Sequence, residues 1–276
     1  MGMNGWMDCY KNTYIIIFKE MKLMNNVILQ AQDIFKDCGF DYAVCGGYGL
    51  DMFVGKELRS HGDFDIVVYN DDKQRIVQFF MDRDWTVYGR FMEEGVPITQ
   101  HLFYKIEDIT DNYWRDCKNM WVIKKDGLPN VLHKLDRLQG GVGEVYTYQT
   151  RKWLVQDNIE FIELEIDAKA GNDFVVQENP RITRPLDKGI LHRDGIPYLA
   201  PEIILFYKSD KFSSEHPSVR PKTEADFKTI MPLLSEEQKQ WLMESIKTAR
   251  GHETPWLDWL TSHCVEMMTF RFRGWV

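Results

Sequence analysis

The chain has 276 residues, of which 44% are hydrophobic and 28% are charged, and its formal net charge is −8. This balance is that of an ordinary globular protein, and the length allows one large domain or two modest ones with a sizeable core. Because non-specific binding to nucleic acid depends on basic surfaces, the negative charge argues against nucleic acid as a partner.

The cysteines and the apolar runs bear on the compartment. The five cysteines are scattered, odd in number and without a Cys-x-x-Cys pair, which favours free thiols in a reducing compartment over a disulfide framework or a zinc site. The apolar run over 14–18 is too short to span a bilayer, and no small-residue cleavage site follows it. We therefore expect a cytoplasmic protein with no membrane partner.

The first third of the chain alternates between helical and strand patterns. Apolar residues at helical spacing predict a helix from about residue 22 to residue 37, followed by a short strand over 41–44 that runs into a turn at Gly46 and Gly47. Further elements are expected in the order helix, strand, helix and strand, over 48–54, 63–69, 72–82 and 85–90. This order indicates an α/β or α+β domain.

The rest of the chain divides into a strand-containing middle and a helical end. Strands are expected over 99–106 and 120–124, a loop at the glycines of 140–143, and a hairpin over 151–168 that turns at Asp157 and Asn158. After Pro185 the spacing becomes helical, with helices expected over 203–208, 224–234, 236–249 and 256–268. We predict two domains, a sheet domain over 1–184 and a mostly helical domain over 185–276.

Asp63 and Asp65 lie two residues apart on a predicted strand, so both side chains leave the same face. Two carboxylates this close repel each other unless a cation lies between them. Mg²⁺ suits them, because it prefers hard oxygens of this kind together with the phosphates of a substrate. On their own the two aspartates also fit a solvated strand end, since short acidic pairs are common.

The residues around this pair point to a phosphate-bearing ligand. Gly46 and Gly47 lie at a strand-to-helix turn, where backbone amides and a helix N-terminus can bind phosphate. Arg59 and His61 directly precede the aspartates and suit the same negative charge, although a histidine at this place can also cap the turn before the strand. Glycine turn, basic residues and alternating acids together predict a metal-dependent site that binds a nucleotide.

The run from Gly46 to Asp65 resembles the nucleotidyltransferase superfamily, in the branch of aminoglycoside 2''-adenylyltransferase and lincosamide nucleotidyltransferase. That branch carries two glycines, an aromatic, a small and a hydrophobic residue and Asp, then Gly with Lys or Arg, then Arg-x-His-x-Asp-x-Asp. The matching residues are Gly46, Gly47, Tyr48, Gly49, Leu50, Asp51, Gly55, Lys56, Arg59, His61, Asp63 and Asp65. The match is tight over 44–68 and diffuse beyond it, and the run over 195–234 resembles the helical C-terminal segment of uncharacterised bacterial relatives.

The resemblance implies a mixed sheet flanked by helices, a metal ion held by Asp63 and Asp65, and a third carboxylate on a later strand. We expect Glu163 to be this third acid, either as a metal ligand or as the general base for the acceptor hydroxyl. Glu165 and Asp167 share its face and stay open as alternatives. The branch often has Asp here, within Leu-Asp-x-x-Pro, so the chain departs from the pattern at this position.

The implied reaction transfers a nucleoside monophosphate, AMP from the co-substrate ATP, to a hydroxyl of a small molecule, with Mg²⁺ bridging the triphosphate and the entering hydroxyl. Arg59 and Lys208 are the expected counter-charges for the phosphates, although a lysine at a helix end also favours the helix dipole. Aminoglycosides, lincosamides and unrelated hydroxylated metabolites are the candidate acceptors. Two other functions stay open: adenylylation of a protein or tRNA, as in toxin–antitoxin pairs, and a nucleotide-binding module without activity.

Overall fold

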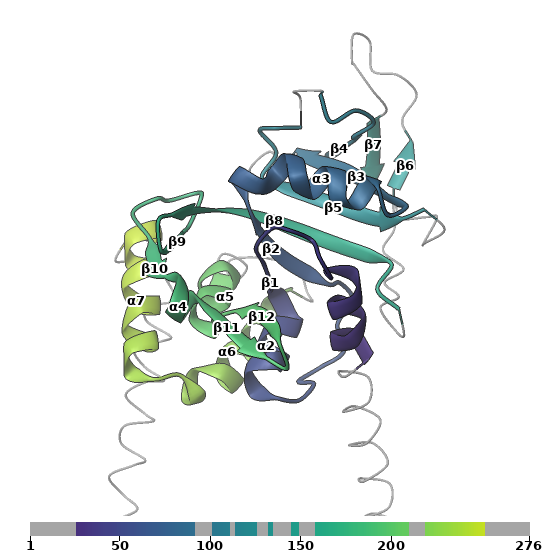
Figure 1. Ribbon diagram of the computed structural model, residues 1–276. Coiled ribbons are helices and arrows are strands. Elements are labelled where there is room, and N and C mark those ends of the chain that lie inside the picture. Colours follow the sequence, from purple (N-terminus) through teal and green to yellow (C-terminus); the bar gives the residue numbers. More distant parts are fainter. Residues whose placement is uncertain are drawn as a thin grey trace, which may run out of the picture. The chain divides into compact units, whose positions relative to one another are not determined.

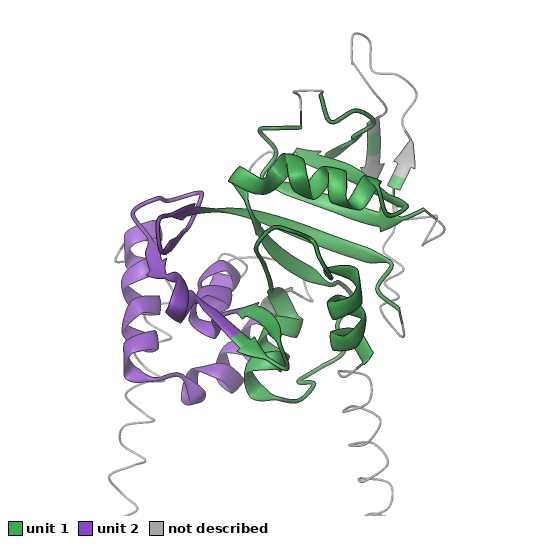
Figure 2. Ribbon diagram, viewed as in Figure 1, with its two compact units in different colours: residues 1–168, 192–198 green, residues 169–191, 199–276 purple. Residues whose placement is uncertain are grey.

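The computed structural model describes residues 26–91, 101–110, 114–125, 132–134, 145–148, 158–209 and 219–251. The chain divides into two units, shown in Figure 2: unit 1 comprises residues 1–168 and 192–198, and unit 2 comprises residues 169–191 and 199–276. The domain boundary expected between residues 184 and 185 stays a prediction.

Unit 1 is built on a mixed β-sheet (Figure 1). Its strands are β1 (Tyr42–Val44), β2 (Asp65–Tyr69), β3 (Trp85–Phe91), β4 (Leu102–Lys105), β5 (Asn119–Lys124), β6 (Leu132–Lys134), β7 (Val145–Tyr148), β8 (Phe161–Ala170) and β12 (Ile196–Leu199). They lie in the order β12-β1-β2-β8-β5-β3-β4-β7-β6. Two pairings are parallel, β1 with β12 and β2 with β8. The others are antiparallel, which confirms the predicted mixed sheet.

In the described part of unit 1, three helices accompany this sheet: a helix over 26–34, α2 (Gly46–Val54) and α3 (Lys73–Met81), the last preceded by a single 3₁₀ turn over Asn70–Asp72. The apolar faces of these helices meet the buried faces of the strands, because each element is hydrophobic on one side only. Core side chains with at most 1% exposure come from both kinds of element, among them Leu50, Ile66, Ile76, Phe80 and Ile162.

Unit 2 is mainly helical. It contains the short strands β9 (Asp173–Val175) and β10 (Thr183–Pro185), then α4 (Leu186–Gly189), α5 (Pro201–Lys208), α6 (Val219–Ile230), a 3₁₀ turn over Met231–Leu233 and α7 (Glu236–Arg250). Pro201 occupies the first turn of α5, where its missing N–H costs nothing. Ser235 and Gln238 form a reciprocal capping box at the start of α7, so two otherwise unpaired backbone N–H groups are satisfied there.

Most of the expected elements are confirmed, with several differences, among them the strands β6, β7, β9 and β10, which were not expected. Gly46 and Gly47 belong to the first turn of α2 rather than to a preceding turn, and β2 begins at Asp65, so Asp63 lies two residues before the first residue of the strand. The helical pattern expected after Pro185 is wrong for β11 (Ile190–Arg193) and β12, which form a hairpin. The 151–157 part of the predicted hairpin, the loop at 140–143 and the helix over 256–268 lie outside the described residues.

The β11–β12 hairpin carried a local signal. Asp194 and Gly195 connect the two strands, and both have positive φ angles, 52° and 79°. An Asp-Gly pair is typical of two-residue hairpin turns with this backbone conformation. Strands of four residues are too short to establish a period of two against the helical pattern that follows, so the hydrophobic spacing alone did not indicate these strands.

Two further expectations concern thiols and membranes. Cys38, Cys45 and Cys117 are free thiols. Among the described residues, we find no helix with both the length and the hydropathy needed to cross a bilayer.

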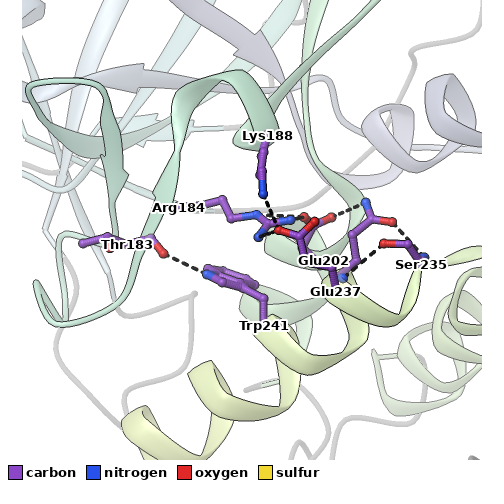
Figure 3. Close-up of polar contacts among 8 residues, drawn as sticks. Thr183, Arg184, Lys188, Glu202, Ser235, Glu237 and Trp241 are labelled. Carbon is purple, nitrogen blue, oxygen red and sulfur yellow. Dashed lines mark hydrogen bonds and ion pairs between the residues drawn. The ribbon is translucent and has the colours of Figure 1, made fainter.

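A buried ion pair organises unit 2 (Figure 3). The Arg184 guanidinium donates to Glu202 Oε1 through Nε at 3.1 Å and through Nη2 at 2.8 Å, and the Glu202 side chain is fully buried. Gln238 donates to the other Glu202 oxygen at 2.8 Å, and Arg184 also reaches Glu237 at 3.2 Å. Burial raises the pKa of Glu202, and the charge of Arg184 opposes that rise. The network therefore joins α5 and α7 to the β10 strand.

We expect Arg184→Met to lower the free energy of unfolding by about 3–5 kcal/mol, because it leaves Glu202 as a buried charge without its cation. The loss should shrink as the pH falls toward the ordinary range of a glutamate. A carboxyl whose folded-state pKa is raised destabilises the fold only where it must stay ionised. Urea unfolding at several pH values measures both effects. Lys188→Met is the control, because its pair with Glu237 is exposed and contributes little. Equal losses for the two variants would contradict a structural role for the buried pair.

Candidate active site

Three carboxylates meet at the start of β2. Asp63, Asp65 and Glu163 each offer an oxygen, and these oxygens all lie within 4.8 Å of one another. The pairing of β2 with β8 explains the meeting: the two strands run parallel with Asp65 opposite Glu163, and paired residues project from the same face of a sheet. Asp63 reaches the cluster from the segment directly before β2. The structure therefore brings together the three residues expected to bind metal.

This donor set fits a hard divalent cation. Three carboxylates at such short separations repel one another, and a cation among them offsets that repulsion. Carboxylate oxygens are what Mg²⁺ prefers, and three of them leave room for water or phosphate oxygens in an octahedral shell. Asp63, Asp65 and Glu163 are thus suited to hold Mg²⁺.

Glu163 is anchored from the neighbouring strands. Its Oε1 accepts a hydrogen bond from Arg90 on β3 at 2.7 Å and another from Asn119 on β5 at 3.1 Å. The side chains of Arg90 and Glu163 are 12% and 9% exposed, so the pair is largely shielded from water. Arg90 is held in turn by His101, whose Nδ1 lies 3.4 Å from two guanidinium nitrogens. These contacts hold the Glu163 side chain in place. The resembled branch often has the shorter aspartate at this position.

The two alternative acids on β8 lie elsewhere along the strand. Glu165 is exposed and lies opposite Val67, while Asp167 is 5% exposed and lies opposite Tyr69, the last residue of β2. Asp63 and Asp65 are grouped with Glu163 in the carboxylate cluster. Position along the strand therefore favours Glu163 over both alternatives as the third acid.

Positions 46 and 47 require glycine because the backbone lies very close to Asp65 and His61 there. Gly46 has a φ of +60°, and a Cβ added there would overlap the Asp65 carboxylate. A Cβ on Gly47 would overlap the His61 ring at Nδ1. A side chain at either position would displace the N-terminus of α2 from Asp65 and His61. The two glycines therefore bring the start of α2 against the site.

Three residues of the motif are joined in a line of hydrogen bonds. Arg59 Nη1 lies 3.1 Å from His61 Nδ1, and His61 Nε2 lies 2.6 Å from Asp51 Oδ2. Asp51 Oδ1 accepts from the backbone N–H of Leu58 at 2.9 Å. Asp51 is fully buried, His61 is 8% exposed, and the ring of Tyr48 packs 4.6 Å from the imidazole. His61 therefore has partners at both ring nitrogens inside the motif.

Lys208, the other expected phosphate contact, lies in unit 2 at the end of α5. Its Nζ pairs with Asp226 of α6 at 2.9 Å, and the two side chains are 14% and 5% exposed. Within unit 2 this contact gives Lys208 a structural role in joining two helices.

Cys45, the residue before α2, is not a candidate nucleophile. Burial raises the pKa of its thiol well above the ordinary value, and the negative charges of Asp65, Glu165, Asp167 and Glu163 raise it further. A thiol that resists ionisation is a poor nucleophile. Cys45 serves instead as a packed residue whose backbone N–H donates to the Asp65 carbonyl at 2.9 Å, which ties α2 to β2.

Sequence reasoning did not find Arg90, Asn119 and His101. Each reaches the site only through the order of the strands, in which β5 lies between β3 and β8, and nothing in the local sequence around them reports that order. Asp51 was visible as part of the matched motif, but its contact with His61 was not predicted.

A comparison with protein families finds a match over the part of the chain that contains the motif. Residues 27–120 match the family model described as aminoglycoside-2''-adenylyltransferase. The matched segment contains Gly46, Gly47, Arg59, His61 and both aspartates of the cluster. The resemblance to this branch of nucleotidyltransferases, predicted from the motif, is confirmed. No curated protein matches the chain.

The chain is similar to solved structures that include two adenylyltransferases and one protein described as nucleotidyltransferase-like. ANT(2'')-Ia in complex with adenylyl-2''-tobramycin shares 10% identity over 79% of this chain and 94% of its own, with a TM-score of 0.39. The lincomycin-bound lincosamide adenylyltransferase LnuA shares 14% over 74% and 95%, also with a TM-score of 0.39. An antigenic nucleotidyltransferase-like protein from Paracoccidioides brasiliensis shares 17% over 83% and 88%, with a TM-score of 0.35.

We expect Gly46→Ala to disturb the site beyond its effect on stability. The substitution places a Cβ at a positive φ, which costs about 1–2 kcal/mol, and it also displaces the Asp65 carboxylate. Gly39→Ala is the matched control: its φ is +69°, and a Cβ there meets nothing within 4 Å. Urea unfolding and Mn²⁺ titration followed by electron paramagnetic resonance should separate the two variants, because both lose stability and only Gly46→Ala loses metal affinity. Equal metal affinity in the two variants would rule out the close approach as the reason for Gly46.

Proposed function

We propose that this protein is a Mg²⁺-dependent nucleotidyltransferase that transfers AMP from ATP to a hydroxyl group of a small molecule. The observation that carries the proposal is the cluster of Asp63, Asp65 and Glu163 beside the N-terminus of α2. Two of these acids lie in the segment that matches the adenylyltransferase family model. A cytoplasmic location fits such an enzyme, because ATP is its co-substrate.

The metal would be held by Asp63, Asp65 and Glu163. When bound, Mg²⁺ supplies positive charge that offsets the triphosphate and the charge developing on the transferred phosphoryl group. The cluster of the three carboxylates supports this role. Arg90 and Asn119 both donate to Glu163 Oε1 and hold the side chain, whose carboxylate would serve as a ligand or take the acceptor proton.

The phosphates would lie against the start of α2. Cys45, the N-cap residue, makes no side-chain cap hydrogen bond, and the amides of the first helical turn have no partner within the helix. Such amides, together with the helix dipole, favour negative charge. Arg59 would add a guanidinium, which suits phosphate oxygens because it presents parallel donors and stays ionised.

The acceptor is proposed to be a cationic or neutral hydroxylated molecule. Glu165 is exposed and lies two residues from Glu163 on β8, so the acidic face of the strand extends beyond the carboxylate cluster. Negative charge of this kind attracts cations, which makes aminoglycosides the first acceptors to screen, followed by lincosamides.

Calorimetric titration with a non-hydrolysable ATP analogue tests the proposal. We expect binding that depends on Mg²⁺ and that is lost in Asp63→Asn/Asp65→Asn, because removing two carboxylates removes the charge that holds the metal. Glu163→Gln should weaken Mg²⁺-dependent binding, whereas Glu165→Gln is the matched control on the same strand and should bind as the wild type does. Absence of binding by any nucleoside triphosphate would refute the enzyme, and a loss in Glu165→Gln instead of Glu163→Gln would refute the choice of third acid.

A second experiment tests the anchor of Glu163. We expect Arg90→Met to weaken Mn²⁺ binding, measured by electron paramagnetic resonance without nucleotide, by about 10- to 100-fold, which is typical when a partner that orients a metal ligand is lost. Arg83→Met is the control, because this substitution also removes one positive charge from unit 1. Arg83 stacks over the Phe79 ring, with its Cζ 3.9 Å from the ring centroid. Unchanged Mn²⁺ affinity in Arg90→Met would show that Glu163 needs no such support.

A further inference from the structure

We infer that Asp51 and His61 are positioning residues that hold the Arg59 guanidinium for the phosphates, and that His61 itself is neither a phosphate ligand nor a proton carrier. The inference rests on the proposed function. It assigns a role to Asp51 and replaces the direct phosphate contact expected of His61 with an indirect one.

The donor and acceptor roles along the line Arg59–His61–Asp51 have one consistent assignment. An arginine side chain can only donate, so His61 Nδ1, which faces Arg59 Nη1 at 3.1 Å, is the acceptor. The proton of the ring then lies on Nε2 and is donated to Asp51 Oδ2 at 2.6 Å. Asp51 selects the tautomer of His61, and the tautomer creates the acceptor that Arg59 uses.

The burial of Asp51 and His61 fixes the orientation of both side chains. Asp51 has no exposed surface, and both of its oxygens are used, one by His61 and the other by the Leu58 backbone N–H. A buried carboxylate with two donors has little freedom to turn. The imidazole packs against the Tyr48 ring and lies so close to Gly47 that a Cβ there would overlap Nδ1. The ring therefore has one orientation, and Arg59 has a fixed acceptor.

The same contacts argue against a direct role for His61. A group that contacts phosphate or carries a proton needs a ring nitrogen that can face the ligand, and both nitrogens of His61 are engaged inside the motif. Arg59 is partly exposed, unlike Asp51 and His61. The line of contacts runs from a fully buried carboxylate to a partly exposed cation, which is the arrangement expected of a support for an arginine.

Nitrogen-15 NMR tests the inference without nucleotide, at one fixed pH. The wild type should show His61 with its proton on Nε2, and the Nε–H group of Arg59 should show restricted motion. In Asp51→Asn, the amide group that faces Nε2 donates instead of accepting, so the proton should move to Nδ1 and Arg59 should gain mobility. A wild-type proton on Nδ1, or an Arg59 whose mobility is unchanged in Asp51→Asn, would overturn the inference.

Two substitutions at position 61 separate the two contacts. His61→Asn places an oxygen near the former Nδ1 and can still accept from Arg59, whereas His61→Gln reaches toward Asp51 and loses the acceptor for Arg59. We expect His61→Asn to keep more of the nucleotide affinity than His61→Gln, which should lose roughly tenfold, the value of one charge-assisted hydrogen bond. The reverse order would overturn the inference. Circular dichroism melting of both variants verifies that each is folded.

A double-mutant cycle excludes a merely structural role for Asp51. If Asp51 acts through Arg59, Asp51→Asn should weaken ATP-analogue binding in the wild type and have no further effect in Arg59→Met. Equal losses in both backgrounds would overturn the inference. Failure of the wild type to bind any nucleotide would refute the proposed function alone, because the NMR measurement of the tautomer and of Arg59 mobility needs no nucleotide.

Discussion

The parallel register between β2 and β8 is the constraint on which the candidate site depends. Val67 and Val68 of β2 are at most 1% exposed, as are Ile162 and Leu164 of β8, so hydrophobic packing on the sheet determines how the two strands align. A slip by one residue would turn every side chain of a strand to the opposite face. The same packing that buries these aliphatic residues therefore places Asp65 beside Glu163, although neither carboxylate contributes to the hydrophobic core.

Holding three acids together requires compensation, and the protein supplies it from two directions. Arg90 and Asn119 bind Glu163 from the antiparallel part of the sheet, and the start of α2 approaches Asp65 closely enough to require glycine at position 46. Arginine pairs and helix N-termini both stabilise negative charge. The proposed cation would complete the balance, because one arginine offsets only one of three carboxylates.

Local and non-local features differ in how far the sequence could predict them. The motif from Gly46 to Asp65 is contiguous, so its glycines, its acids and its basic residues could be recognised from spacing, and β3, β5, α3, α5 and α7 were found from hydrophobic periodicity. Glu163 was found because alternation along β8 places it on a polar face, but alternation alone could not choose between it, Glu165 and Asp167. That choice depends on which residue of β8 lies opposite Asp65, and a single sequence carries no statement of strand pairing. Arg90 and Asn119 were missed for the same reason.

The contacts within the motif also change how its residues should be interpreted. Gly46 makes room for Asp65, Gly47 makes room for His61, Asp51 binds His61, and His61 binds Arg59. Residues that look like separate ligands in a sequence pattern are thus mutually dependent, and only some of them need to touch a substrate. Substitutions among residues that share contacts are not additive. The loss caused by any one of them measures the integrity of the whole arrangement, and only a cycle of paired substitutions can separate a ligand from the residue that supports it.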